Sequence, residues 1–131
     1  MITIRSYYPY IPSILVAAGI LIVTLWEFDP LNPPTNLPND KLMHALAYAM
    51  LAMTYMAAAL YKGYTHCRHY IYTAIGCIAY GALMEALQAW ITTTRTADIW
   101  DILANAIGVG CGLLVLSMIN YLWLRKHTYT K

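Results

Sequence analysis

The stretch YGALMEALQAWITTTRTADIWDILANAIGVGCG, residues 80–112, decides how the whole chain is interpreted. It contains two apolar segments joined by a short polar turn. In the first segment, Glu85 and Gln88 are three residues apart, so both project from one face of a helix. The next segment carries a second polar stripe, at spacings of three and four, formed by Asp98, Asp101 and Asn105. Because a carboxylate inside an apolar membrane helix is costly and marks a functional site by default, the two stripes predict a site.

The composition favours a membrane protein, because 60% of the 131 residues are hydrophobic and only 11% are charged. A soluble domain carries about 25% charged residues, so this chain has too few to cover a surface in water. A soluble helical core, the alternative, would need helix faces rich in Lys and Glu, which these segments lack. Each of four apolar runs has, or can reach by short extension, roughly the 20 residues that cross a bilayer. We therefore expect an all-α integral membrane four-helix bundle in a single domain, residues 1–131, with spans at about 10–28, 41–61, 70–91 and 99–124.

The distribution of basic residues predicts how the bundle is oriented. Short cytoplasmic loops collect Lys and Arg. One side of the expected bundle carries six such residues and the other carries two: Arg5, Lys62, Arg68, Arg125, Lys126 and Lys131 against Lys41 and Arg95. Both termini and the loop at 62–69 are therefore expected in the cytoplasm, with the loops at 29–41 and 92–99 outside. Because the loops are short, the four helices are expected to run antiparallel.

Small residues predict where the helices approach one another. Ala104, Gly108 and Gly112, spaced by four, form a small-residue packing face on the fourth helix. Gly81 on the third helix is expected to let a neighbouring backbone come near. Residues 66–69 contain three potential metal ligands, but a solvated basic loop is the expected structure there.

Depth along the helices brings the polar residues to one end of the bundle. At 1.5 Å per residue, His44 lies roughly one turn below the outer end of the second span. Glu85 lies about 9 Å from the outer end of the third span, and Asn105 lies about 10 Å below Asp98 on the fourth. The topology therefore predicts convergence, in the outer half of the membrane, of Asp40, Lys41, His44, Glu85, Gln88, Arg95, Asp98, Asp101 and Asn105.

Most of these residues have a structural explanation as well as a functional one. Asp40 and Asp98 are placed to cap helices. Gln88 and Asn105 would serve as interhelical hydrogen bonds, each typically worth about 0.6 kcal/mol. Glu85 is too deep to cap a helix and needs a buried partner. The candidate partners are Arg95, Lys41 and His44.

The functional interpretation assigns chemistry to the same side chains. Glu85, His44 and Asp101 are the candidate catalytic residues, because a carboxylate and an imidazole can act as acid and base. Lys41 and Arg95 are placed to receive a phosphate. The further candidates for contact with a substrate are Gln88, Asn105 and Tyr48. A divalent cation is an alternative ligand, for which the candidate residues are Asp40, Asp98 and Asp101.

At these residues the sequence resembles the VanZ-like membrane protein family. Three motifs carry the resemblance across essentially the whole chain: Asp40-Lys41-x-x-His44 with Tyr48, Tyr80-Gly81-x-x-x-Glu85-x-x-Gln88, and Arg95-x-x-Asp98-x-x-Asp101-x-x-x-Asn105-x-x-Gly108. The chain departs from the family before the Arg, where Thr92, Thr93 and Thr94 replace the usual Pro or Phe. The resemblance implies a small four-helix protein of the bacterial cytoplasmic membrane, and the count of basic residues places its site on the extracytoplasmic side. The family's named member is associated with teicoplanin resistance, so a contribution to glycopeptide resistance is implied, but no particular reaction.

Three functions follow as hypotheses. In the first, the outward-facing site binds, and in one version modifies, a lipid-linked or other anionic cell-envelope substrate. The partners of the protein would then be membrane lipids and a cell-wall intermediate. In the second, the chain is a non-catalytic binding or assembly module, alone or as an oligomer, whose polar cluster fixes helix packing. In the third, it is a transporter or proton relay, which is disfavoured because nothing charged lines the inner half of any expected span. A nucleic-acid partner is not expected from a net charge of only +2.

Overall fold

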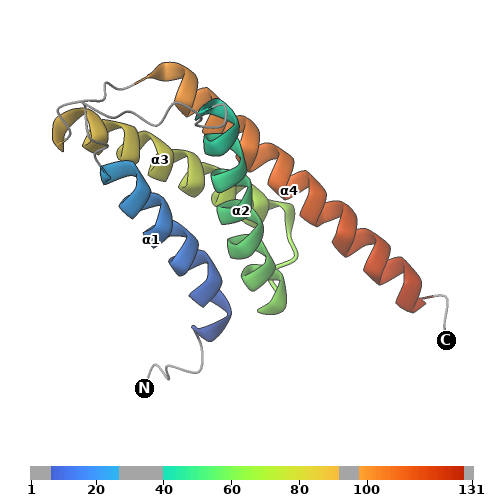
Figure 1. Ribbon diagram of the computed structural model, residues 1–131. Coiled ribbons are helices and arrows are strands. Elements are labelled where there is room, and N and C mark those ends of the chain that lie inside the picture. Colours follow the sequence, from blue (N-terminus) through green and yellow to red (C-terminus); the bar gives the residue numbers. More distant parts are fainter. Residues whose placement is uncertain (1–6, 27–39, 92–97, 129–131) are drawn as a thin grey trace.

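The computed structural model describes residues 7–26, 40–91 and 98–128, and within these ranges all regular structure is helical. A short 3-10 helix, η2 (Tyr8–Tyr10), leads into α1 (Ile11–Leu25). The remaining elements are α2 (Asp40–Tyr61), α3 (Cys67–Ile91) and α4 (Ile99–Thr128), as Figure 1 shows. The prediction of an all-α chain with four long helices is therefore confirmed.

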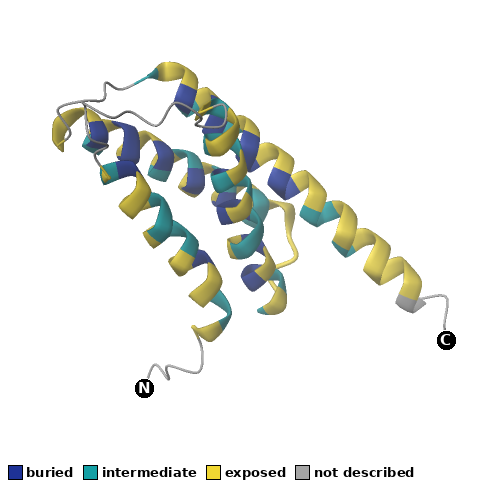
Figure 2. Ribbon diagram, in the orientation of Figure 1, coloured by how far each residue is buried: buried dark blue, intermediate teal, exposed yellow. Residues whose placement is uncertain are grey.

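Each of the four helical segments is long and apolar enough to cross a membrane. The candidate spans, Tyr8–Leu25, Asp40–Tyr61, Cys67–Ile91 and Ile99–Lys126, overlap those predicted from the sequence. Large apolar side chains lie exposed along all four helices; Leu15 on α1 and Leu114 on α4 are both 66% exposed (Figure 2). Monomeric soluble proteins rarely expose so much contiguous apolar surface, whereas lipid chains solvate it without cost. This architecture is that of a membrane-spanning protein.

The first helix is shorter than predicted. It ends at Leu25, because Trp26 has extended backbone angles, φ −73° and ψ 114°. Trp26 therefore does not lengthen the first span, and residues 27 and 28 lie outside the described ranges.

The third helix begins earlier than predicted, at Cys67, inside the segment expected to be a loop. The reason is the tight end of α2. Gly63 has a φ of +86°, and its N–H donates to the carbonyl of Leu60 at 2.9 Å. The N–H of Tyr64 donates to the carbonyl of Ala59 at 3.0 Å, which completes a Schellman motif. Because this turn consumes so few residues, α3 can start before the predicted boundary.

Helices α2 and α4 pack backbone to backbone through glycine. A Cβ atom added at Gly108 would collide with the backbone of Ala45, and one added at Gly112 would collide with that of Ala49. Ala104 is also buried, at 8% exposed. The small-residue packing face predicted on the fourth helix is therefore confirmed, and α2 is the helix that occupies it.

The two ends of α2 meet different surroundings. In its first turn, Lys41 pairs with Asp98 and Asp101 at the start of α4. Near its last turn, the ring of Tyr55 lies 5.3 Å from that of Tyr10, which precedes α1. The start of α2 is thus surrounded by charged groups and its end by tyrosines.

Candidate functional site

A cluster of polar side chains forms where the start of α2, the last turns of α3 and the start of α4 meet. On α2 two of its members lie three and four residues before the third, on α4 successive members are three and four residues apart, and α3 contributes one, so helical periodicity puts each set on one face. The term polar cluster is used below for Asp40, Lys41, His44, Glu85, Asp98, Asp101 and Asn105. The predicted stripes therefore face one another, as the contacts among these residues show.

The ammonium group of Lys41 bridges two carboxylates of α4. It lies 2.5 Å from Asp98 Oδ2 and also hydrogen-bonds Asp101 Oδ1. Lys41 and Asp98 are about 40% exposed, at 41% and 39%, whereas the Asp101 side chain is only 10% exposed. The cation held by Asp98 and Asp101 is therefore the lysine itself.

Asp98 also caps α4. Its Oδ1 accepts a hydrogen bond from the backbone N–H of Trp100 at 2.9 Å, so the cap predicted from the sequence is present. The hydrogen bond from Lys41 and, second to it, the one from Trp100 hold the pKa of the Asp98 carboxyl below its ordinary value. Capping and ion pairing thus act on the two oxygens of one side chain.

His44 stands at the centre of the cluster. Its Nδ1 lies 3.1 Å from Asn105 Oδ1 and 3.8 Å from Glu85 Oε1. Its Nε2 lies 3.9 Å from Asp101 Oδ2 and 4.0 Å from Asp40 Oδ1. One imidazole therefore faces carboxylates from all three helices.

Glu85 and Asn105 carry polar atoms whose hydrogen-bonding capacity is unused. Their exposures are 2% and 1%. The backbone N–H of Asp98 hydrogen-bonds to the Glu85 carboxylate. Within residues 7–26, 40–91 and 98–128, however, Glu85 Oε2 and Asn105 Nδ2 are buried without a partner. A buried polar group left unsatisfied costs about 1–3 kcal/mol, and more when it is charged. These two atoms are the positions at which a ligand would form new hydrogen bonds.

Three members of the cluster lie close enough together to hold a metal ion. Asp40, His44 and Asp101 each offer one ligand atom within 4.8 Å of the other two. When His44 Nδ1–H donates to Asn105, Nε2 of the neutral ring keeps its lone pair and is turned toward the two carboxylates. An imidazole with two carboxylates suits a divalent metal such as zinc or manganese. This set differs from the predicted one, since His44 takes the place of Asp98.

Gly81 and Tyr48 shape the floor of the cluster. A Cβ atom added at Gly81 would meet Asn105 Nδ2 at 2.9 Å and the Tyr48 ring at 3.2 Å. The expectation that Gly81 admits a neighbouring backbone is therefore wrong, because side chains fill the space above it. The Tyr48 side chain is 2% exposed, so it supports the cluster from within the core.

Two predicted site residues remain to be placed. Gln88 is buried at 4% exposed, one turn along α3 from Glu85. Arg95 lies outside the described residues, so its predicted contact with a phosphate stays a prediction.

Comparison of the chain with protein-family models, with curated proteins and with solved structures finds no match. Conclusions about function therefore rest on the residues of the cluster and their geometry.

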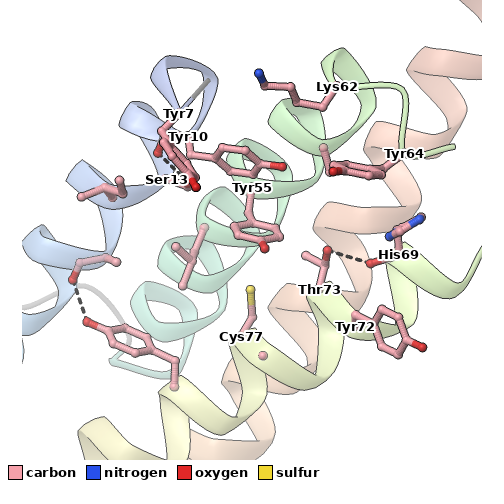
Figure 3. A pocket seen from close by; sticks show the side chains of 16 residues that line it. Tyr7, Tyr10, Ser13, Tyr55, Lys62, Tyr64, His69, Tyr72, Thr73 and Cys77 are labelled. Atoms are coloured by element: carbon pink, nitrogen blue, oxygen red, sulfur yellow. Dashed lines mark hydrogen bonds between the residues drawn. The ribbon is translucent and has the colours of Figure 1, made fainter. Parts of the chain in front are cut away.

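The sequence patterns did not predict a second feature, a cavity near the opposite end of α2 (Figure 3). The sequence does contain the residues that could have indicated this cavity, which are two facing stripes of tyrosines and small residues. One stripe is Tyr10, Ser13 and Ala17 before and along α1, and the other is Thr73, Gly76, Cys77 and Tyr80 along α3. Tyr80 also ties the two helices together, since its hydroxyl donates to the Ala17 carbonyl at 2.8 Å.

Proposed function

We propose that the polar cluster binds the anionic head group of a lipid-linked cell-envelope substrate and modifies it by acid–base chemistry. The observation that supports this most strongly is the environment of Glu85. Its carboxylate is 2% exposed, lies 3.8 Å from His44 Nδ1 and, among the described residues, has no hydrogen-bond partner for Oε2. A carboxylate and an imidazole this close can act together as acid and base on a substrate that binds beside them.

The other members of the cluster have roles in this proposal that follow from their contacts. Asn105 holds the His44 ring through Nδ1, which selects the tautomer with a free Nε2. The Lys41 ammonium remains partly exposed at the rim, where an approaching phosphate would share it with Asp98 and Asp101, the two carboxylates that it already pairs with. For Arg95, which lies outside the described residues and the defined cluster, we propose a bidentate phosphate contact, because a guanidinium group permits one.

A divalent cation at Asp40, His44 and Asp101 is compatible with the same proposal. When bound, it would act as a Lewis acid on a phosphoryl or carbonyl oxygen. His44 would then serve as a ligand through Nε2, and Glu85 would be left as the acid–base residue.

The membrane setting of the proposal is an antiparallel bundle with both termini in the cytoplasm and the cluster on the extracytoplasmic side. The contacts of Lys41 with α4 at one end of α2, and of Tyr55 with Tyr10 at the other, support the antiparallel arrangement. The excess of Lys and Arg on the opposite side supports the orientation. We place the chain in the VanZ-like family of bacterial cytoplasmic membrane proteins on its three motifs, and from that family the proposal takes a contribution to glycopeptide resistance.

A second candidate function has an observation of its own. The Lys41 bridge joins α2 to α4 through a compensated ion-pair network, which is the arrangement expected of a purely structural polar cluster. In that case the chain is a non-catalytic membrane binding or assembly module.

The substitution Glu85→Gln separates the two functions. It keeps the shape and hydrogen-bonding capacity of the side chain but removes its charge and its ability to transfer a proton. For a general acid–base residue, activity should fall by about 10²-fold or more while insertion and abundance stay normal. For a structural residue, the neutral amide costs less to bury, so function and stability should be retained or improved.

The readout is complementation of a bacterial strain from which the gene has been deleted, scored by teicoplanin susceptibility and other envelope phenotypes together with membrane protein level. Ser117→Ala is the matched control, because this hydroxyl lies far along α4 and donates to its own helix, at the Leu114 carbonyl. Full complementation by Glu85→Gln at normal abundance would exclude the acid–base function in favour of the assembly module. Repeating the assay with divalent cations chelated tests the metal separately.

A further inference from the structure

The cavity at the far end of the molecule has the size of a ligand site. It lies between α1, α2 and α3, with a volume of about 830 Å³, and no member of the polar cluster lines it. Small-molecule sites typically span about 300–1,000 Å³. Counted along α2, its rim residue Lys62 is roughly 33 Å from Asp40, at 1.5 Å per residue. The cavity is therefore a separate feature from the proposed site.

The rim of the cavity is basic. Figure 3 shows Lys62 and Tyr64, which follow α2, and His69 from the first turns of α3 around this end. None of the lining residues is an Asp or a Glu. Among the residues that the structure describes, no carboxylate lies within ion-pairing distance of Lys62. An anion at this rim would therefore meet positive charge without a competing acidic side chain.

The interior of the cavity is apolar in effect. Ile14, Leu51 and Cys77 contribute apolar surface to its wall. The two aliphatic hydroxyls that line it are already satisfied by main-chain carbonyls: Ser13 donates to Tyr10 and Thr73 donates to His69, each at 2.8 Å. The interior thus accepts hydrocarbon without leaving these donors unpaired.

We propose that this cavity binds one acyl chain of an anionic phospholipid whose phosphate contacts Lys62. The basic rim and the apolar interior match the two halves of such a molecule, and the tyrosines around the mouth suit the membrane–water interface. Basic pockets between transmembrane helices bind anionic lipid head groups in this way. The proposal does not depend on the chemistry of the polar cluster.

Native mass spectrometry of the full-length chain in detergent, titrated with phosphatidylglycerol or phosphatidylcholine, measures the binding. We expect the anionic lipid to bind more tightly, and Lys62→Gln to weaken it about fivefold, the loss corresponding to ~1 kcal/mol for one Lys at an anionic surface. Lys126→Gln, which removes a basic residue outside the cavity, should not reproduce this change.

Gly76→Leu tests the acyl-chain site. Gly76 lines the cavity, and a Cβ atom there meets nothing within 4 Å, so leucine should enter the cavity and reduce binding of both lipids at least tenfold. Gly110→Leu is the matched control, because Gly110 has the same free space on α4 but does not line the cavity. Unchanged binding by Gly76→Leu, or equal losses in the two glycine variants, would overturn the proposal.

Two further arms use the unaltered protein and so do not depend on the folding of a variant. Phosphatidylglycerol with a photoreactive group on its acyl chain should label peptides that contain Leu51 or Cys77. Labelling confined to α4 would contradict the proposal. Inorganic phosphate that binds as tightly as the lipid would identify a site for free anions and would equally refute it.

Discussion

Asp98 shows how one half-buried residue at the rim of the cluster couples a helix end to a neighbouring helix. Its two oxygens bond the Trp100 N–H and the Lys41 ammonium, and both interactions favour the ionised form. The pKa of this carboxyl is accordingly held below its ordinary value of 3.8. A group whose pKa is lower in the folded than in the unfolded protein contributes stability above its unfolded pKa. That contribution is lost as the pH falls through the folded value.

Replacement of Asp98 by Asn should therefore change how stability depends on acid. Asn keeps a capping oxygen but cannot pair with Lys41 as a charge. Above about pH 5 the wild-type protein should melt at a higher temperature than the Asn variant, and the difference between the two melting temperatures should stay constant. Below about pH 4 that margin should shrink, because the wild-type carboxyl becomes protonated. Melting of both proteins in detergent between pH 3 and pH 7 checks this, and a margin that persists unchanged at pH 3 would contradict the assigned ion pair.

At the residue scale, spacing in the sequence predicted which polar side chains share a face but not how they pair. Glu85 and Asn105 were expected near His44, and they lie there because the periodicity of three helices fixes their faces. Lys41 was expected to meet a phosphate, yet it bridges Asp98 and Asp101. That choice depends on the rotamer of a long side chain and on the separation of two helices, neither of which a sequence pattern encodes.

At the element scale, the contact between α2 and α4 sets the position of the cluster. The glycines of α4 let the two backbones touch, and this contact, at Ala45 and Ala49, lies about one and two turns along α2 from Lys41. If α2 and α4 were farther apart at Gly108, His44 would move away from Asn105, because His44 lies on α2 and Asn105 lies on α4.

Gly108→Ala should accordingly destabilise the fold by about 1–3 kcal/mol, the usual cost of overpacking, because its methyl group would overlap the Ala45 backbone. Gly110→Ala on the same helix meets nothing within 4 Å and should be neutral or slightly stabilising. The measurement is the free energy of unfolding of each variant, obtained by titration with sodium dodecyl sulfate in mixed micelles. Equal stabilities would show that α2 and α4 do not approach as closely as described.

The existence of the four helices was predictable from apolar length, but the end of α1 and the start of α3 were not. The start of α3 depends on the left-handed conformation of Gly63, which shortens the connection from α2. The sequence contains the glycine, but a glycine near a helix end is equally compatible with a longer loop.

At the scale of the whole molecule, charge is segregated along the helix axes. The described carboxylates, Asp40, Glu85, Asp98 and Asp101, all belong to the polar cluster, whereas Lys62 and Arg68 lie about one membrane thickness away along α2 and the start of α3. The sequence already indicates this segregation. The lining stripes on α1 and α3 are visible in the sequence, but the cavity between them was not predictable, because it depends on how far α1 lies from α2 and α3.

The central claim is that the polar cluster opens to the outside of the cell. Its most direct test is labelling of single cysteines with a membrane-impermeant maleimide in intact cells, using a variant in which Cys67, Cys77 and Cys111 are replaced by alanine. The account predicts that cysteine at position 93, in the connection between α3 and α4, reacts in intact cells. Cysteine at position 65, between α2 and α3, should react only after permeabilisation. Labelling of position 65 and not of position 93 in intact cells would place the cluster in the cytoplasm and contradict the account.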